Sequence, residues 1–277
     1  MNMEKVTGNA LVNLIILIFA VLIIFPLGQL FTYASQEGLG IFLNRIIAPE
    51  ALNAMWLTIE IGIAATLVNL FVGTAVAFVL HRGNVRFKSV LDALVDIPLA
   101  IPTIVIGFAL LLLYGPQGWL GRYFNAAGLQ VLFSFPGILL AHIFVTFPFM
   151  VRAVGTALAG VDPNFERAAK TLGATSIQTF IHVTLPAIKG GLIAGSVLTF
   201  AKSVGEFGAT LMVSGNLLGK TQTGPLYIFS RFNTGDIEGA SAIALILAVF
   251  SFIVLFILRF VTEEKKEAVK VESSDRC

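Results

Sequence analysis

The chain has 277 residues, of which 57% are hydrophobic and only 12% are charged, and its formal net charge is +2. Because a soluble domain carries about 25% charged residues, this composition excludes an ordinary soluble globular protein and indicates an integral membrane protein. The small net charge gives no indication of a nucleic-acid partner, and the one cysteine, Cys277, excludes a disulfide framework or a cysteine-based metal site.

Six segments are long and apolar enough to cross a bilayer as helices, which takes about 20 residues each. In chain order they are residues 9–33, 52–80, 90–114, 135–154, 187–213 and 240–261. The first is too long for the apolar region of a signal peptide and no obvious cleavage site follows it, so we expect a retained helix. We predict an all-α polytopic membrane protein with a single transmembrane domain, residues 1–262, and a polar cytoplasmic tail, residues 263–277, that is expected to be disordered.

The positions of the lysines and arginines predict the orientation of these spans. Thirteen of the 18 lie before the first span, in the connections that follow the second and fourth spans and their flanks, or in the tail. Lys202 lies inside the fifth span, and the other connections hold only Arg45, Arg122, Lys220 and Arg231. Since connections rich in Lys and Arg stay in the cytoplasm, both termini are predicted to be cytoplasmic.

The third span carries a carboxylate close to two prolines. Asp96 lies one helical turn deeper than Asp92 and precedes Pro98 and Pro102. Proline removes a backbone donor and bends a helix, so we predict a kink here. A kinked helix with a carboxylate at its base suits a gate, and a structural cap explains the same residues equally well.

The connection between the fourth and fifth spans, residues 161–186, is more patterned than a polar linker. Asp162 is placed to cap a helix whose first residue is Pro163, and Gly173 is placed to end it. The apolar residues recur at helical spacing and form one face of each of two short pieces: Phe165, Ala168, Ala169 and Leu172, then Ile177, Phe180, Ile181 and Leu185. Such a face must pack against the base of the bundle, the lipid interface or a partner protein.

The fifth span combines a polar pair with a stripe of small residues. Lys202 and Glu206 are four residues apart and share one helix face, where they could simply neutralise each other. Small residues recur at every fourth position: Ala187, Gly191, Gly195, Thr199 and Ser203. This stripe lets another backbone approach closely, which is typical of a helix at the centre of a bundle. We therefore predict that the helix lines a translocation path, with Ser203 and Phe207 accessible from water in at least one state of transport.

Two other features of the sequence do not indicate a function. Glu60, in the second span, has no partner that the sequence suggests. The stretch G-N-L-L-G-K-T at 215–221 lacks the first glycine of a phosphate loop, because Ser214 stands at that position. It also follows a membrane span, whereas a phosphate loop follows a buried strand. We therefore expect no ATP site, and we do not expect this chain to be an enzyme.

The 161–186 segment resembles the E-A-A, G and I-x-L-P signature of the permease subunits of ABC importers. Five positions match, namely Ala168, Ala169, Gly173, Leu185 and Pro186. Arg167 stands at the acidic position and reverses its charge, while Glu166 comes one position earlier. The resemblance implies a coupling helix that docks on an ATP-hydrolysing subunit, with the site residues Glu166, Arg167, Ala168, Ala169, Leu172, Gly173, Leu185 and Pro186.

Three stretches are similar to the oxyanion branch of these permeases. S-V-G-E-F-G-A-T-L-M-V-S-G-N (203–216) and L-D-A-L-V-D-I-P-L-A-I-P-T (91–103) are similar to the sulfate and molybdate/tungstate permeases, and L-Y-G-P-Q-G-W-L-G (113–121) looks more like the sulfate permeases. The resemblance implies a type I ABC importer permease fold with six transmembrane helices in the cytoplasmic (inner) membrane of a bacterium or archaeon. We place its path or gate at Asp96, Pro98, Pro102, Lys202, Ser203, Glu206 and Phe207.

The resemblance also implies partners. These are a pair of ATPase subunits, a second permease subunit, identical or related, and an extracytoplasmic binding protein for an oxyanion, with sulfate or thiosulfate favoured. No cofactor is expected. Two alternatives stay open at this point: a molybdate or tungstate permease, and a proton-coupled secondary transporter with Asp96 or Glu206 as the proton relay.

Overall fold

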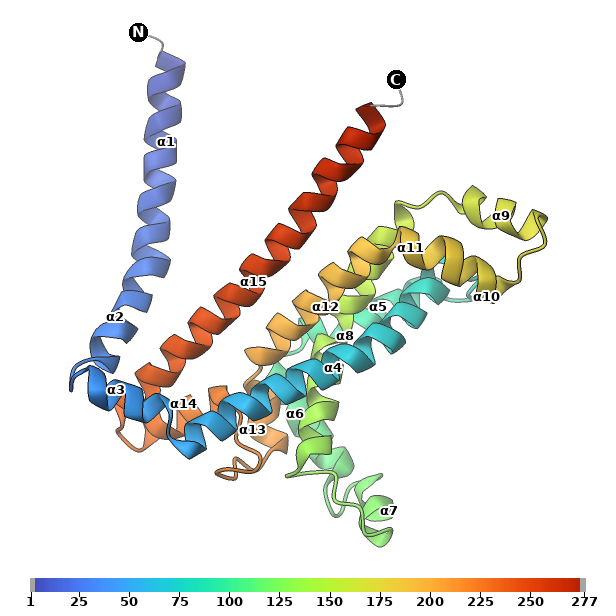
Figure 1. The fold of residues 1–277 in the computed structure, drawn as a ribbon. Coiled ribbons are helices and arrows are strands. Elements are labelled where there is room, and N and C mark those ends of the chain that lie inside the picture. Colours follow the sequence, from blue (N-terminus) through green and yellow to red (C-terminus); the bar gives the residue numbers. More distant parts are fainter. Residues whose placement is uncertain (1–2, 275–277) are drawn as a thin grey trace.

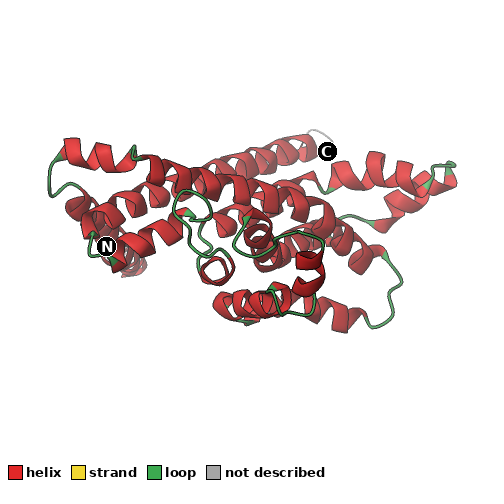
Figure 2. Cartoon of the chain, turned by 90° about the horizontal axis from the view of Figure 1, so that it is seen from below, coloured by secondary structure: helices red, strands yellow, loops and turns green. Residues whose placement is uncertain are grey.

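The computed structural model describes the backbone of residues 3–274 and the side chains of residues 11–254 and of Phe256. Over these residues the chain consists of helices and loops without a strand (Figures 1 and 2). A π-helical turn at Ala20–Ile24 joins the first two helices. The helices are α1 Met3–Phe19, α2 Phe25–Ala34, α3 Leu39–Ile46, α4 Pro49–Arg82, α5 Lys88–Ala100, α6 Thr103–Tyr114, α7 Gly121–Ala126, α8 Phe135–Ala159, α9 Pro163–Thr171, α10 Ser176–Thr179, α11 Leu185–Ala187, α12 Lys189–Val204, α13 Gly208–Val213, α14 Gly224–Asn233 and α15 Ile237–Ser274.

The described helices supply four uninterrupted candidate membrane spans, and six if each of two bent helix pairs is one span. The uninterrupted spans are Leu11–Ala34, Pro49–Arg82, Phe135–Ala159 and Ile237–Val254. The bent pairs are α5 with α6, at 105°, and Ser176–Ala187 with α12, at 70°. The all-α, six-span prediction is confirmed in this form, with two spans that are not straight.

The bend in the third span follows from its prolines. Pro98 lies inside α5, and Pro102 is the residue that precedes α6. Each proline lacks the backbone N–H that would continue the helix, so the chain leaves helical geometry between Ala100 and Thr103. The predicted kink is confirmed.

The helix of the fifth span ends earlier than predicted. Helix α12 ends at Val204, and residues 205–207 separate it from α13. The prediction of one helix over 187–213 is therefore wrong, because neither proline nor a polar run marks the break in the sequence. Glu206 lies inside this break and is buried.

Helices α4, α8 and α12 form the centre of the bundle. A Cβ atom added at Gly195 of α12 would lie 2.7 Å from the sulfur of Met150 on α8, and one added at Gly62 of α4 would lie 2.8 Å from the ring of Phe200. The stripe of small residues on α12 therefore does what the sequence predicts, since it allows close backbone approach inside the bundle.

Helix α6, the second half of the bent third span, packs against α13, the short helix that follows the break after α12. A Cβ atom at Gly107 of α6 would lie 2.6 Å from the carbonyl oxygen of Ala209 on α13. A Cβ atom added at Gly208, the first residue of α13, would likewise clash with the side chain of Thr103, the first residue of α6. The breaks in the third and fifth spans thus meet in space.

The ends of the chain lie at the periphery. Helix α2 packs against α15, and the described side chains of α1 are largely exposed. The start of α1, the end of α15 and helix α9 lie toward one end of the molecule, with α7 toward the other (Figure 1). The expectation of a disordered tail is wrong as far as Ser274, because the backbone of α15 stays helical to that residue.

Candidate functional site: a coupling segment and an intramembrane polar cluster

The coupling segment, residues 161–186, folds locally as its sequence predicts. The side chain of Asp162 accepts a hydrogen bond of 2.9 Å from the backbone N–H of Asn164 and so caps α9, whose first residue is Pro163. Gly173, with a φ of +89°, ends the helix in the left-handed region that favours glycine. Thr175 and Gln178 then form a reciprocal capping box for α10.

Much of the apolar face of this segment is not covered by the described part of the chain. The exposed fractions are 64% for Phe165, 88% for Leu172 and 72% for Ile177. The chain's own bundle covers only the far end of the face, where Phe180 packs edge-on against Phe78 of α4 with ring centroids 5.3 Å apart. For Phe165, Leu172 and Ile177, the lipid interface and a partner protein remain as possible covering surfaces.

Glu166 joins the coupling segment to the bundle. Its Oε1 atom lies 3.1 Å from Nε of Arg82, at the end of α4, and accepts a hydrogen bond of 3.0 Å from Thr184. The Arg82 guanidinium also donates to the carbonyl oxygens of Leu158 and Val161, at 3.1 and 2.7 Å, where α8 ends. One arginine therefore satisfies the last carbonyls of α8 and fixes α9 against α4.

The carboxylate of this ion pair therefore belongs to Glu166, one position before Arg167, which stands at the acidic position of the motif. Arg167 is exposed, and within the described residues its hydrogen-bond partner is Asn164, at 3.4 Å. The charge reversal at Arg167 is tolerated because the carboxylate of Glu166 points into the joint and Arg167 does not take part in it.

Two hollows flank α9. One, of about 420 Å³, is lined by Ala169, Leu172, Gly173 and the following turn. The other, of about 390 Å³, is lined by Arg82, Glu166, Arg167 and Lys170 among others. The remaining motif residues lie close by: Leu185 is half-buried, and Ala168 and Pro186 are exposed.

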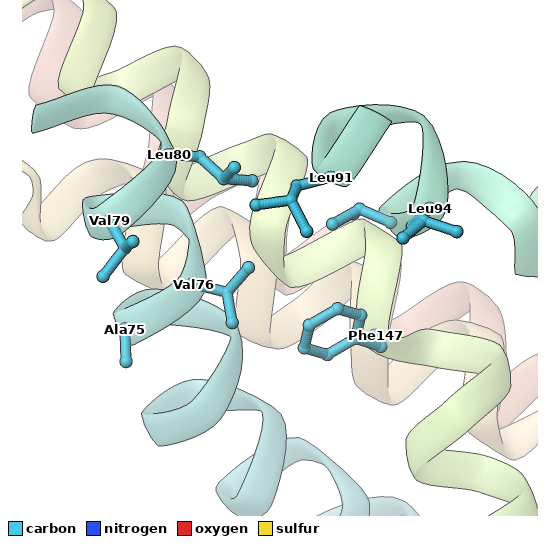
Figure 3. A pocket seen from close by; sticks show the side chains of 8 residues that line it. Ala75, Val76, Val79, Leu80, Leu91, Leu94 and Phe147 are labelled. Atoms are coloured by element: carbon cyan, nitrogen blue, oxygen red, sulfur yellow. The ribbon is translucent and has the colours of Figure 1, made fainter. Parts of the chain in front are cut away.

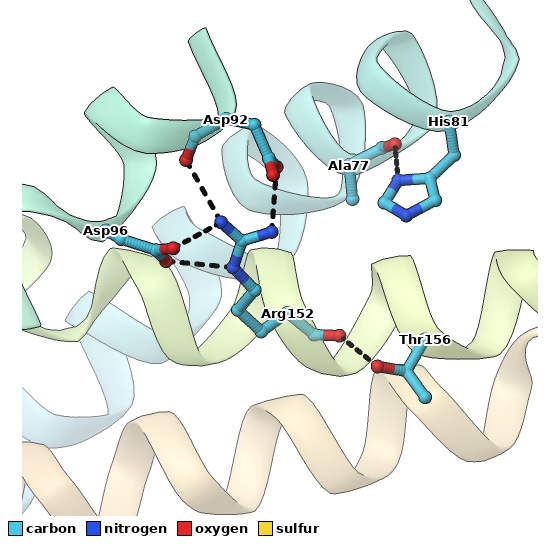
Figure 4. A network of polar contacts seen from close by, with 6 residues as sticks. All are labelled: Ala77, His81, Asp92, Asp96, Arg152 and Thr156. Carbon is cyan, nitrogen blue, oxygen red and sulfur yellow. Dashed lines mark hydrogen bonds and ion pairs between the residues drawn. The ribbon is translucent and has the colours of Figure 1, made fainter. Parts of the chain in front are cut away.

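A second ion-pair cluster joins α5 to α8. Arg152 donates to both carboxylate oxygens of Asp96, at 2.8 and 2.6 Å, and to a carboxylate oxygen of Asp92 at 2.7 Å (Figure 4). A further bond of 3.0 Å runs to the backbone carbonyl of Asp92. This role of Arg152 was not predicted from the sequence, in which the residue stands among the cytoplasmic charges that flank the next connection. Asp96 is therefore a paired carboxylate at the base of the kinked span.

An apolar pocket of about 460 Å³ lies beside this cluster, between α4, α5 and α8 (Figure 3). Its lining consists of Ala75, Val76, Val79, Leu80, Leu91, Leu94, Val95 and Phe147. An anion in such a pocket would lose its hydration without a hydrogen-bond donor to replace it. The pocket is therefore not a site for an oxyanion.

The intramembrane polar cluster surrounds the break in the fifth span. Lys202 Nζ lies 3.0 Å from Glu206 Oε2, so the predicted pair forms. The other carboxylate oxygen of Glu206 accepts a bond of 3.0 Å from the backbone N–H of Ala209. The Glu206 side chain is 1% exposed and that of Lys202 is 38% exposed. The carboxylate is thus held inside the protein, and the ammonium lies at its edge.

His142 of α8 bridges the same break. Its Nδ1 atom lies 2.6 Å from Oγ of Ser203 on α12, and its Nε2 atom lies 2.8 Å from Oγ1 of Thr210 on α13. Spacing along the sequence offers no signal for these contacts of His142, because its partners are more than 60 residues away. The imidazole fixes α12 and α13 relative to each other.

Two predicted path residues contact side chains of other helices. Ser203 is fully buried against His142 in this conformation, and its exposure to water in another state of transport stays a prediction. The ring of Phe207 contacts the ring of Phe229 at a tilt of 57°, with the centroids 5.2 Å apart, and lines an apolar pocket beside α14 and α15. Its role in a path stays a prediction. Glu60 is exposed on α4 and makes no ion pair or hydrogen bond with any described residue.

Comparisons with known proteins agree with these features. Residues 70–266 match the family described as the binding-protein-dependent transport system inner membrane component. The chain is 35% identical over 249 residues to a protein of Chlorokybus atmophyticus named probable sulfate transport system permease protein cysT, covering 90% of this chain and 87% of that protein. It is 37% identical over 247 residues to the sulfate transport system permease protein CysW of Escherichia coli K12, covering 89% and 85%.

Solved structures show the same fold. A chain of a bacterial alginate ABC transporter, in complex with its alginate-bound periplasmic protein, superposes with a TM-score of 0.75 at 17% identity, covering 94% of this chain and 96% of that one. A chain of the MetNI methionine ABC transporter gives 0.59 at 16% identity, covering 77% and 94%. The chain therefore belongs to the family of inner-membrane components of binding-protein-dependent transport systems, as a non-catalytic permease with the type I importer fold.

Proposed function

We propose that this chain is the permease subunit of an ATP-driven importer of an oxyanion, with sulfate as the favoured substrate and thiosulfate as a second. The observation that carries the proposal is the coupling segment. Its apolar face is exposed while its base is pinned by Arg82 and Glu166. A rigidly anchored helix with an uncovered apolar face is built to receive a partner. The names of the sulfate permease relatives support the choice of anion.

The proposal includes the partners of such an importer. A pair of ATPase subunits docks on α9 of this chain and on the same helix of a second, identical or related, permease. A binding protein delivers the anion at the opposite side. In this arrangement the membrane is the cytoplasmic membrane of a bacterium or archaeon, and both termini lie in the cytoplasm with α9.

The mechanism is alternating access. ATP-driven closure of the ATPase pair draws the two coupling segments together, and hydrolysis releases them. The joint at Arg82 carries the movement of α9 into α4 and α8, and the Arg152 cluster carries it from α8 into α5. Only ATP and the loaded binding protein shift the equilibrium, because only they bind the two states with different affinity.

Reconstitution tests this proposal. The permease, its ATPase and its binding protein are placed in proteoliposomes, and the uptake of labelled sulfate is measured with and without ATP on the ATPase side. Uptake that needs ATP and that unlabelled sulfate suppresses more strongly than molybdate supports the proposal. Uptake driven by a proton gradient without the ATPase would contradict it, and stronger suppression by molybdate would reassign the substrate.

A further inference from the structure

Lys202 occupies an unusual position for a lysine in a membrane span. Helix α12 packs against α4, α8 and α15 on its other faces. The side chain of Lys202 is 38% exposed, so part of it lies on the side that the described residues leave uncovered, next to Glu206, which is 1% exposed. The ammonium is therefore the accessible half of a pair whose other half is not.

The uncovered side does not face lipid. A cation in hydrocarbon is costly and is found facing a protein interior or a water-filled cavity. The backbone gives a second, independent argument, because the helix is broken at residues 205–207 and Gly205 is exposed. Non-helical backbone at membrane depth is tolerated only inside protein or along a water-filled cavity. Both observations place Lys202 on the inner side of the assembled permease.

The surroundings of Lys202 fix its ammonium and leave donors free. Glu206 is held by the Ala209 N–H at 3.0 Å and holds Lys202 Nζ at 3.0 Å. His142 fixes the helices on both sides of this pair. An ammonium has three N–H donors, and Glu206 is its hydrogen-bond partner among the described residues. The other donors therefore remain available to a ligand on the exposed part of an ammonium that Glu206 already holds in place.

We propose that Lys202 is the residue that contacts the oxyanion in transit and that Glu206 is its built-in counter-charge. This inference rests on the proposed function, since it assigns the anion contact within that path. A tetrahedral dianion accepts hydrogen bonds from the free donors of the ammonium. An unopposed lysine would hold a dianion too firmly to release it, and conduction requires sites that bind weakly enough to be left. The buried carboxylate makes the pair neutral and so keeps the contact transient.

Chemical replacement of the lysine tests the contact. In a Cys277→Ser background, Lys202→Cys is expected to lower ATP-dependent sulfate uptake at least tenfold. Treatment with 2-aminoethyl methanethiosulfonate restores an ammonium at this position and is expected to restore uptake, whereas 2-sulfonatoethyl methanethiosulfonate, of similar size, is not. The matched control is Lys220→Cys, at an exposed lysine in the loop before α14, where neither reagent is expected to alter uptake.

Glu206→Gln tests the counter-charge. It keeps the shape of the side chain and leaves Lys202 unopposed, so we expect a lower KM for sulfate together with a lower maximal rate. Normal uptake by the untreated Lys202→Cys variant, equal restoration by both reagents, or an unchanged KM and rate in Glu206→Gln would each overturn the inference. If Lys202→Cys fails to assemble with the ATPase, Lys202→Arg and Lys202→Met supply the same comparison of charge. Failure of the Cys277→Ser parent itself to import sulfate would instead contradict the proposed function.

Discussion

At the residue scale, the joint between the coupling segment and the bundle depends on Glu166. Its carboxylate is shared by Arg82 and Thr184, and the ion-paired side chains are only 13% exposed. Removing one partner of a buried ion pair costs roughly 3 kcal/mol or more. Because both side chains of this pair are largely buried, we expect a cost that approaches this value. Because the cost falls on the joint that we propose transmits the movement of α9, it should affect transport more than membrane insertion.

We therefore expect Glu166→Ala to lower ATP-dependent uptake at least about tenfold, the factor that corresponds to ~1.4 kcal/mol, while the permease still inserts and binds its ATPase. Uptake per ATP hydrolysed in proteoliposomes measures this. The control is Arg86→Gln, four residues beyond Arg82, where the arginine is exposed and lies over the ring of Phe87. Equal uptake in Glu166→Ala and the control would show that the joint does not transmit movement.

Side-chain roles were only partly predictable from the sequence. The Lys202–Glu206 pair and the Asp162 cap are local, so spacing alone predicts them. The pairs made by Arg82, Arg152 and His142 join residues 56 to 84 positions apart, which only the packed helices bring together. The resemblance included both Glu166 and Arg167 and counted the acidic position of the motif onto Arg167, whereas the three-dimensional joint uses Glu166.

At the element scale, α6 and α13 meet with no space for a side chain. Gly107 would place a Cβ atom 2.6 Å from the Ala209 oxygen and 2.7 Å from its Cα, both of which are backbone atoms that cannot rotate away. Overpacking costs about 1–3 kcal/mol, and the gain in helix propensity from glycine to alanine is at most about 1 kcal/mol. The steric cost wins.

Gly107→Ala is accordingly expected to lower the thermal midpoint of the purified permease by several degrees. Gly190→Ala, on α12, has no atom within 4 Å of the added Cβ and should leave the midpoint unchanged or raise it. Thermal unfolding in detergent, followed by the loss of monodisperse protein, makes the comparison. A Gly107→Ala midpoint at or above that of Gly190→Ala would contradict the close packing of the two helices.

Substitutions in the Arg152 cluster should differ in how strongly they destabilise the contact between α5 and α8. Loss of Asp92 or of Asp96 leaves one ion pair, whereas loss of Arg152 leaves two neighbouring carboxylates that repel each other. We expect Arg152→Gln to destabilise the permease more than Asp92→Asn or Asp96→Asn, by the same thermal measurement. The reverse order would mean that the aspartates serve another purpose, such as the gate considered from the sequence.

The positions of the membrane spans were more predictable from the sequence than the positions at which their helices break. Hydropathy locates the spans because the bilayer sets their length. Pro98 and Pro102 reveal the bend between α5 and α6. The break at 205–207 carries no such signal, since it is held by His142 and by the packing of α13 on α6.

At the scale of the whole molecule, the coupling segment exposes apolar residues to which we propose that a separate ATPase subunit binds. Leu172 is 88% exposed, so a charge at this position would not disturb the fold. The same charge would be desolvated unpaired in the contact with an ATPase subunit, which is unfavourable. We expect Leu172→Glu to insert normally but to lose its ATPase during co-purification. Leu218→Glu, at an exposed leucine of the loop after α13, should keep it.

The most direct test of the whole account is the initial rate of sulfate uptake into proteoliposomes that hold the permease, its ATPase and ATP, with binding protein on the opposite side. The account predicts ATP-dependent uptake by the parent and by Leu218→Glu, and none by an inserted Leu172→Glu variant. Uptake by Leu172→Glu at the rate of the parent, or uptake by the parent without ATP, would contradict it.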